Sequence, residues 1–516
     1  MSSHPRPRVL MVGLDAADPV LVERWMSDGS LPHLAALRRD GLGGRLATSA
    51  RYLSGSPWPT FYCGQPPSYH GIYHDFQWRH ERMGFAAPGG GWLPVRPFWR
   101  HLQGDTRVVV YDVPMIPAAE PFSGVEITGW ASHDKLDPPH SHPPQLLRDV
   151  ERQRGQWPVP PEPYGTVPLA ALLELRNVLL DNTRRSVELC VELLRLPWDL
   201  ALVAFSAPHR GGHRLWDRSS AHGRGSDEAW ATFDGALRDL YVACDEAVGR
   251  LVAAVPDAVV IAFSVHGMTT NTSRADLLDG MLARVLSSNG SGATRPGVLR
   301  SLGEQLPPSL RRALTARVPV RLRDRIMTAW ATGGTDWRKT PAFTLRADLQ
   351  GYVRVNLAGR EPQGIVSPGA ECERLCDRIR AGLLSFRDAS TGEPFVQQVC
   401  RSDDVFPAGT RRDRLPDLLV LWADTPAASH TAVHSPTFGV VERATPGRIP
   451  GGRSANHRPE GFVVARGPGI APGGRLDRDA DILDLAPSVL RIVGAGTAVP
   501  LAGKVLPALA AAGLAQ

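Results

Sequence analysis

The sequence predicts an α/β protein built on a doubly wound, mostly parallel sheet. Short apolar runs, typical of strands that are covered on both faces, alternate along the chain with longer segments of helical spacing. Several of these runs end at a residue that can carry out chemistry, and open α/β sheets place their functional groups at the carboxyl ends of strands. Together the two observations favour a sheet with helices on both faces.

The pattern begins at the N-terminus. Residues 8–14 form the near-continuous apolar run RVLMVGL, which ends at Asp15. Residues 21–39 then have helical spacing, and Leu31-Pro32 predicts a break into two helices. The same order recurs further along the chain. We expect strands at 107–111, 201–205, 258–263, 418–422 and 461–465, and helices at 168–195, 227–254, 372–386 and 481–493.

Residues from about 272 to 412 interrupt this alternation. They contain an amphipathic basic stretch at 298–330 and a mixed α/β pattern up to about residue 400. We therefore expect an α/β core formed by residues 1–271 and 413–516, with residues 272–412 inserted as a cap subdomain. The Pro-rich segment 138–163 predicts an irregular surface excursion.

Composition and charge narrow the classes of partner. The 516 residues carry a formal charge of only +6, from 58 Lys and Arg against 52 Asp and Glu, and no basic tail. This argues against a nucleic acid polymer as partner and is compatible with a small anionic substrate. The six cysteines form no Cys-x-x-Cys pair, which fits a reducing compartment. With no signal-like segment and no apolar stretch of about 20 residues, we expect a cytoplasmic protein without a membrane partner; its oligomeric state is open.

The run at 201–205 leads into the most informative stretch of the chain. It breaks at Ser206-Ala207-Pro208 and is followed at once by His209, Arg210, His213 and Arg214. If the chain is helical after Pro208, the two histidines are an i, i+4 pair on one face and can bind one transition metal. The two arginines are candidates for holding an anion. A pair of solvated histidines in a basic loop is the alternative.

Other strand ends supply further candidates. Common nucleotide-binding signatures and the Gly-x-Ser-x-Gly elbow of serine esterases are absent from the sequence. Five clusters stand in a fixed order: Asp15 in VGLDAAD; Ser54, ten residues before Gly64 and followed by Pro67–Ile72; His209 and His213 with Trp216; Ser264-Val265-His266-Gly267; and His457 before Arg-Pro-Glu-Gly. In their order and spacing these clusters resemble the alkaline phosphatase superfamily, especially its type I phosphodiesterase/nucleotide pyrophosphatase branch.

The resemblance implies a site for two metals. One metal would take His209, His213 and His457, and the other would take Asp15, Ser54 and His266. Two aspartates of the family pattern are missing, because His209 and Val265 stand in their places. Three neutral histidines with an open fourth position still form a catalytic zinc arrangement, whereas a site that loses a carboxylate to valine should bind a cation poorly. Whether the chain binds one or two divalent metals is therefore open, and the imidazole ligands favour zinc as the metal.

The activity implied by the resemblance is metal-dependent hydrolysis or transfer at a phosphate ester, a phosphodiester or a nucleotide-type anhydride. Ser54 is the expected nucleophile, Thr60 is its rival by residue type, and Arg210 and Arg214 would neutralise charge on the transferred group. Asp75, Asp112 and Asp134 could supply the missing carboxylate. The altered ligands leave two alternatives: a one-metal enzyme acting on a sulfuryl or phosphonate substrate or in a biosynthetic group transfer, and an inactive relative that binds an anion.

Overall fold

The structure is a computed structural model of the whole chain. It describes residues 7–89, 96–118, 120–132, 135–156, 162–163, 165–287, 325–326, 328–329, 332–333, 335–444 and 451–512. The chain forms two compact units. The first unit comprises residues 1–66, 89–270 and 452–516, and the second comprises residues 67–88 and 271–451.

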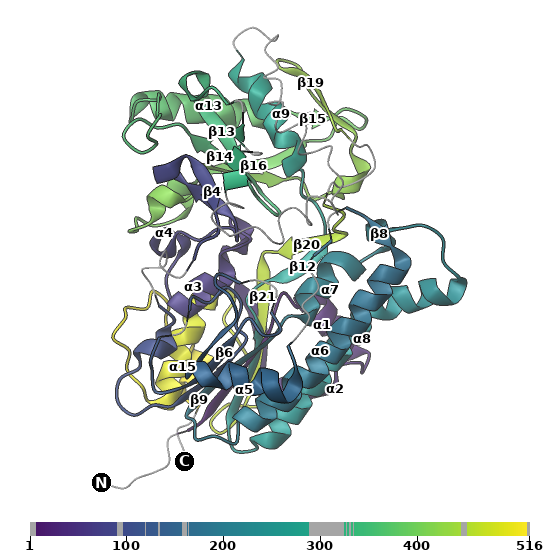
Figure 1. Cartoon of the computed structure of the whole chain (residues 1–516), viewed down its shortest axis with the longest axis vertical. Coiled ribbons are helices and arrows are strands. Elements are labelled where there is room, and N and C mark those ends of the chain that lie inside the picture. The colour runs from purple at the N-terminus through teal and green to yellow at the C-terminus, as the bar shows by residue number, and fades with distance from the viewer. Residues whose placement is uncertain are drawn as a thin grey trace. The chain divides into compact units, whose positions relative to one another are not determined.

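A nine-stranded sheet forms the centre of the first unit (Figure 1). Its strand order is β22-β2-β21-β11-β1-β9-β5-β6-β7. The parallel middle consists of β11 (Val259–Ser264), β1 (Val9–Leu14), β9 (Leu200–Phe205), β5 (Val108–Tyr111) and β6 (Gly124–Thr128). On one side β21 (Glu460–Arg466) runs antiparallel to both β11 and β2 (Leu42–Ala47), and β22 (Gly474–Arg475) pairs parallel with β2. On the other side β7 (His140–His142) is antiparallel to β6.

Helices cover both faces of this sheet. Leu10, Val12 and Leu14 of β1 face one apolar layer, whereas Val9 and Met11 face the other, as the two-residue period of a strand requires. The first layer contains α1 (Pro19–Ser27), α2 (Pro32–Arg39), α6 (Leu169–Leu193) and α8 (Asp227–Ala254), with α5 (Pro144–Arg154) nearby. The second contains α3 (Pro57–Cys63), α15 (Leu485–Val493) and α16 (Pro507–Ala510). The prediction of a doubly wound, mostly parallel sheet is confirmed.

The second unit is built on a smaller, antiparallel sheet. Its strands are β13 (Ala342–Leu345), β14 (Gly351–Val355), β17 (Leu418–Trp422) and β16 (Val396–Arg401), in that order. Helices α9 (Ala275–Leu286) and α13 (Ala370–Leu384) share an apolar core with it. Smaller elements are α4 (Pro67–His70), α14 (Ser402–Val405), the β3 and β4 hairpin (Gln77–Arg79, Gly84–Ala86), and the sheet of β15 (Arg387–Asp388), β18 (Ala432–Ser435) and β19 (Gly439–Glu442).

The domain boundaries differ from those expected. The second unit begins at Asn271, beside the predicted residue 272, but it ends at Gly451 and not at 412. The expected boundary is wrong because β17, an apolar run like those of the large sheet, pairs antiparallel with β14 and β16. Residues 67–88 also belong here, since the Trp78 ring packs on Phe343 and its Nε1 donates to Glu361. The amphipathic stretch expected at 298–330 lies outside the described residues, apart from 325–326 and 328–329.

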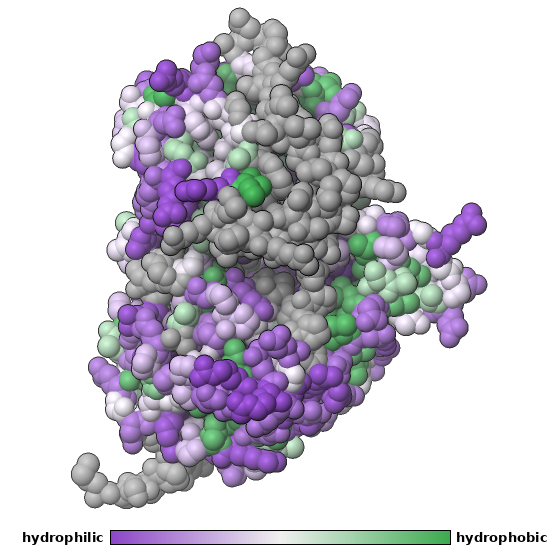
Figure 2. Space-filling model, in the orientation of Figure 1, coloured by the Kyte–Doolittle hydropathy of each residue, from purple (hydrophilic) through white to green (hydrophobic). Residues whose placement is uncertain are grey.

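The coloured surface, the cysteines and the described helices do not by themselves point to a particular function. Among the coloured residues of the face in Figure 2, hydrophilic ones predominate and hydrophobic ones form small areas. All six cysteines are free thiols. Within the part of the chain that the structure describes, none of the helices combines the length and the apolar character that crossing a membrane requires.

Candidate metal centre

Four histidines of the first unit converge from three segments, of which two follow the central strands β9 and β11 and the third precedes β21. The chain leaves β9 at Ser206 and enters α7 (Ala207–Leu215), where Pro208 stands in the first turn, so His209 and His213 form the predicted i, i+4 pair. His266 lies between β11 and β12 (Gly267–Thr270). β12 pairs antiparallel with β20 (Ala455–Arg458) and places Met268 opposite His457.

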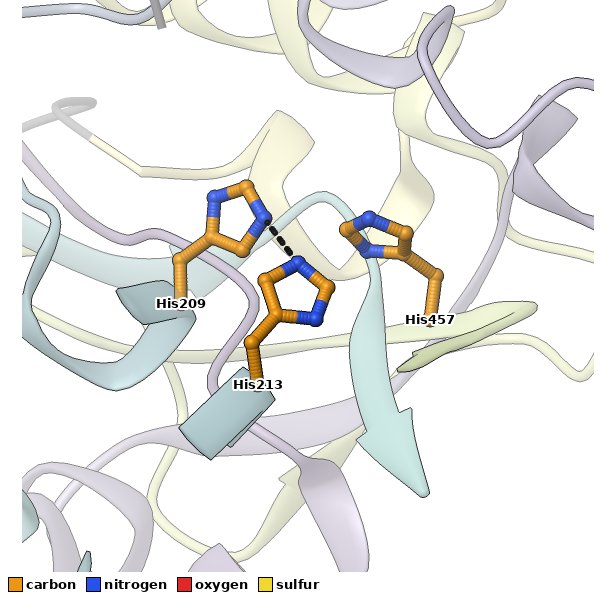
Figure 3. Close-up of side chains that lie close together, drawn as sticks. All are labelled: His209, His213 and His457. Atoms are coloured by element: carbon orange, nitrogen blue, oxygen red, sulfur yellow. Dashed lines mark hydrogen bonds between the residues drawn. The ribbon is translucent and has the colours of Figure 1, made fainter. Parts of the chain in front are cut away.

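Three of the four histidines can share one ion. His209, His213 and His457 each offer a ring nitrogen such that these atoms all lie within 4.8 Å of one another, and all three residues are buried. Figure 3 shows His209 and His213 side by side, with His457 facing them from β20. His266 is adjacent, its ring centroid 4.5 Å from that of His457 and 5.8 Å from that of His209.

Hydrogen bonds fix the ring tautomers of the α7 pair. His213 Nδ1 lies 3.0 Å from the carbonyl oxygen of Ala455, which can only accept, so Nδ1 carries the proton. His209 Nδ1 lies 2.8 Å from Asp15 Oδ2 and donates to that carboxylate. The two Nε2 atoms lie 3.1 Å apart, and with only this one proton on each ring they would face each other as lone pairs. Two such lone pairs repel unless a proton or a cation lies between them.

The electrostatic environment favours a cation over an extra proton. Burial lowers the pKa of His213 well below its ordinary value, with Arg453 and the neighbouring imidazoles adding to the effect. Burial also lowers the pKa of His266 to about 4, although Asp15 opposes the shift. Burial alone would raise the pKa of Asp15, but His209, His266 and the Trp58 N–H hold it well below its usual range. Burial therefore favours neutral imidazoles at His213 and His266, beside the ionised carboxylate of Asp15.

The donor set fits a divalent transition metal. Neutral imidazole is a common ligand of zinc, and Zn–N bonds of about 2.0–2.1 Å in a tetrahedral site place two nitrogens about 3.3 Å apart. The Nε2 atoms of His209 and His213 are separated by 3.1 Å. Both rings donate their other N–H to an oxygen, which is the support that metal-binding histidines usually have. His209, His213 and His457 are thus the residues that could hold the metal.

Asp15 supports this cluster in a way that the sequence does not reveal. It follows β1, is 1% exposed, and accepts a hydrogen bond at each oxygen: Oδ2 from His209 and Oδ1 from Trp58 Nε1 at 2.7 Å. The prediction placed Asp15 among direct metal ligands of a second site. That role stays a prediction, and the structure adds that the Asp15 carboxylate holds the His209 ring through a hydrogen bond. Trp58 was missed, because an indole N–H gives no signal in a sequence until its acceptor is known.

Ser54 lies in the same unit, between the short helix Ser49–Arg51 and α3. It is 3% exposed, and its hydroxyl has no hydrogen-bond partner among the described residues. Thr60, the rival nucleophile, is inside α3 and its hydroxyl lies 3.2 Å from that of Ser49. A buried hydroxyl left without a partner is a candidate for a functional role. The contrast between the two residues favours Ser54.

The two arginines of α7 are both buried, at 4% exposure for Arg210 and 2% for Arg214. The guanidinium of Arg214 donates to backbone carbonyls, those of Pro163, Gly165 and Gly452. Burial lowers its pKa to about 10, with Glu162 opposing the shift. These contacts anchor two loops to α7. They speak against the predicted role of Arg214 in neutralising a substrate, and Arg210 keeps that role as a prediction.

The structure gives other partners to the carboxylates that the sequence offered as replacements for the missing aspartate. Val265 is fully buried in the apolar cluster that includes Trp58. Asp112 accepts two backbone N–H groups at 2.7 and 2.8 Å, and Asp75 belongs to the second unit, where it pairs with the adjacent histidine. Asp134 lies outside the described residues. The second half of the predicted two-metal site, Asp15, Ser54 and His266, therefore has a single carboxylate, and that carboxylate is already engaged.

Comparison with known proteins places the chain in a family. The sequence model of the family described as type I phosphodiesterase / nucleotide pyrophosphatase matches residues 9–439. Among the curated proteins none matches the chain significantly. Similar solved structures include phosphonoacetate hydrolase from Sinorhizobium meliloti 1021 in complex with phosphonoacetate, at 13% identity, with 95% of this chain and 96% of that chain covered and a TM-score of 0.48. Human ectonucleotide pyrophosphatase / phosphodiesterase 5 is similar at 12% identity, 97% and 100% coverage and a TM-score of 0.45.

The family match spans most of the chain and includes Asp15, Ser54, the α7 histidines and His266. It thus covers most of the residues on which the resemblance was based; His457 follows the matched range. The chain belongs to the type I phosphodiesterase / nucleotide pyrophosphatase family.

Proposed function

We propose that this protein is a metal-dependent hydrolase of phosphate esters, with a phosphodiester or nucleotide-type compound as substrate. The observation that carries the proposal is the convergence of three buried histidines: Nε2 of His209 and Nε2 of His213 lie 3.1 Å apart, and a ring nitrogen of His457 lies within 4.8 Å of them. Family membership supports the reaction class. Zinc is the proposed metal, because three imidazoles suit it better than magnesium, which prefers oxygen ligands.

Ser54 is the proposed nucleophile. Its hydroxyl would lose its proton as the oxygen attacks phosphorus in line, and one alcohol of the diester would take up a proton and leave on the opposite side. Water would then cleave the bond between serine and phosphorus, which releases the remaining phosphate monoester and restores the serine hydroxyl. The unpartnered hydroxyl supports this role, because no hydrogen bond among the described residues has to break before the attack. The metal, when bound, would lower the pKa of a coordinated hydroxyl and offset negative charge at the phosphoryl group.

Only one metal is proposed per chain. Both oxygens of Asp15 already accept N–H groups, and Val265 cannot bind a cation. A single metal on three neutral ligands offsets less substrate charge than two metals would. This favours, as the second candidate, a change of chemistry within the same fold, toward a sulfate ester, a phosphonate or a group transfer. A cytoplasmic location remains a prediction, compatible with six free thiols.

Metal analysis and turnover test the proposal together. We expect about one equivalent of zinc per chain and turnover of an aryl phosphodiester above that of aryl monoester and sulfate probes. Ser54→Ala should lower kcat by about 1,000-fold or more while the zinc content stays the same. Thr60→Val, which removes the rival hydroxyl and keeps the shape of the side chain, is the matched control and should retain activity.

Each other outcome has a defined meaning. Two equivalents of zinc would contradict the one-metal site. Higher turnover of the sulfate probe would select the second candidate. Full activity in Ser54→Ala with loss in Thr60→Val would reassign the nucleophile, and a protein that neither binds metal nor turns over any probe would be the inactive relative.

A further inference from the structure

We propose that Trp58 is a positioning residue that couples the Ser54 segment to the metal-binding helix α7 through Asp15. The inference rests on the proposed function and deepens it, because it identifies the contact that ties the nucleophile's segment to a metal ligand. The coupling runs from Trp58 Nε1 to Asp15 Oδ1 and from Asp15 Oδ2 to His209 Nδ1.

The two hydrogen bonds hold the Asp15 carboxylate from both sides. Trp58 donates at 2.7 Å and His209 at 2.8 Å, and each takes a different oxygen. Trp58, Asp15 and His209 are 3%, 1% and 5% exposed, so water has little access to compete for either oxygen. Charge-assisted hydrogen bonds in such a setting are strong and directional. Rotation of the carboxylate, and with it the direction of His209 Nε2, therefore depends on the indole N–H.

The indole itself is fixed by close packing. A Cβ atom on Gly13 of β1 would lie 2.8 Å from Trp58 Cη2, so only glycine leaves room for the ring at this position. The rings of Phe61 and Phe263 contact it edge to face, each with a centroid distance of 5.9 Å. Trp58 is therefore seated against β1 and cannot move without displacing its neighbours.

The same residue is tied to the nucleophile. Trp58 is the second residue of α3 and follows Ser54 by four positions. The intervening turn is tight, because the carbonyl oxygen of Leu53 accepts from both the backbone N–H and the hydroxyl of Ser56, at 3.0 and 2.7 Å. The Ser56 hydroxyl oxygen also lies 2.7 Å from the hydroxyl oxygen of Ser49, from which it can accept. A shift of the indole is thus transmitted to the Ser54 loop on one side and to Asp15 on the other.

Zinc binding by the purified full chain tests the coupling directly. Trp58→Phe removes the N–H and keeps an aromatic ring, and we expect it to raise the Kd for zinc, measured by competition with a chromophoric chelator, by about tenfold. Trp99→Phe is the matched control, since Trp99 is buried in the same apolar cluster and donates its N–H to the Glu126 carboxylate at 3.2 Å. It should leave the Kd within about twofold of wild type. The visible spectrum of the cobalt(II) form should shift in Trp58→Phe and not in Trp99→Phe.

The outcomes separate this inference from the proposed function. If wild type binds no zinc, or His209→Ala binds it as tightly as wild type, the proposed metal site fails. If His209→Ala loses zinc while Trp58→Phe keeps the Kd and the cobalt spectrum of the Trp99→Phe control, the metal site stands and the positioning role is overturned. Should Trp58→Phe not fold, Gly13→Ala displaces the indole from the opposite side, and an unchanged Kd in that variant would overturn the role equally.

Discussion

The candidate metal centre has two halves: the α7 half, formed by His209 and His213, and the Asp15 half, formed by Asp15 and the groups that donate to it. The two halves differ in how their polar atoms are paired. In the α7 half, the Nε2 atoms of His209 and His213 lie 3.1 Å apart, where one cation can contact both. In the Asp15 half, each carboxylate oxygen accepts an N–H group, one from His209 and one from Trp58. The polar atoms of the second half are therefore paired within the protein, whereas those of the first are placed to share an ion. A residue type that can bind metal is thus a proposed ligand in one place and the hydrogen-bond partner of a proposed ligand in another.

The largest effect should follow from removing an α7 histidine. His213→Ala deletes one of the two facing Nε2 atoms and leaves His209 and His457 as a two-ligand site, so we expect loss of zinc by at least about 100-fold in affinity and loss of turnover. Zinc content after dialysis measures the effect. His222→Ala, at an exposed histidine of β10 (Ala221–His222), is the control and should bind as wild type does. Retention of one full equivalent in His213→Ala would show that α7 is not the metal site.

Acid should destabilise the metal-free protein through the cluster. Burial lowers the pKa of folded His266 to about 4, whereas an unfolded histidine has its ordinary value of 6.5. Between these values the unfolded chain binds a proton that the folded chain does not, so the free energy of unfolding should fall as the pH drops from about 6.5 to 4. For His266 alone the fall is of the order of 3 kcal/mol. Urea unfolding at several pH values, with chelator present, measures it.

His266→Gln is the control for this pH dependence, because glutamine keeps a polar side chain that does not titrate. The variant should show a flatter decline than wild type over the same range. An equal slope in both proteins would assign the acid sensitivity to other groups and would contradict the shift at His266.

A smaller effect on zinc binding should follow from removing the charge of Asp15, which accepts the N–H of His209. Asp15→Asn keeps the shape of the side chain but removes the charge that holds the N–H of His209, so the zinc Kd should rise about 10- to 100-fold, without complete loss. Asp18→Asn is the matched control: Asp18 is equally buried, caps α1 by accepting from Val20 and Leu21, and pairs with Arg458. It should cost stability and leave the Kd unchanged. Complete loss of zinc in Asp15→Asn would instead make Asp15 a direct ligand.

The sequence predicts the fold of the first unit well, because its signals are local. The apolar run before Asp15 is a strand within one residue of the expected bounds, and Leu31-Pro32 does separate α1 from α2. Residues 418–422 were correctly predicted as a strand but assigned to the wrong sheet. An apolar run is compatible with any buried strand, and its partners, β14 and β16, are fixed only by contacts distant in sequence.

The candidate site shows the same limit. The spacing of His209 and His213 predicts one helical face, and the structure brings His457 and His266 to it. The spacing of residues in the sequence does not predict which hydrogen-bond partner each polar atom has. The engagement of Asp15 by Trp58, and of Arg214 by backbone carbonyls, depends on donors and acceptors that meet only in the folded chain.

The smallest expected effect on metal binding concerns Val265. From the sequence alone, Val265→Asp should restore a ligand and raise metal occupancy. The structure changes this prediction: Val265 is fully buried in an apolar cluster, and the oxygens of Asp15, its only proposed carboxylate partner, are taken by His209 and Trp58. We expect Val265→Asp to lower the free energy of unfolding by about 2–4 kcal/mol, as an unpaired buried carboxylate does, and to leave the zinc content at one equivalent. Val265→Thr, of similar size and uncharged, should cost less. A second equivalent of zinc in Val265→Asp, with thermal stability restored by the metal, would mean that the Asp15 half can open to a cation and that the two halves differ in degree only.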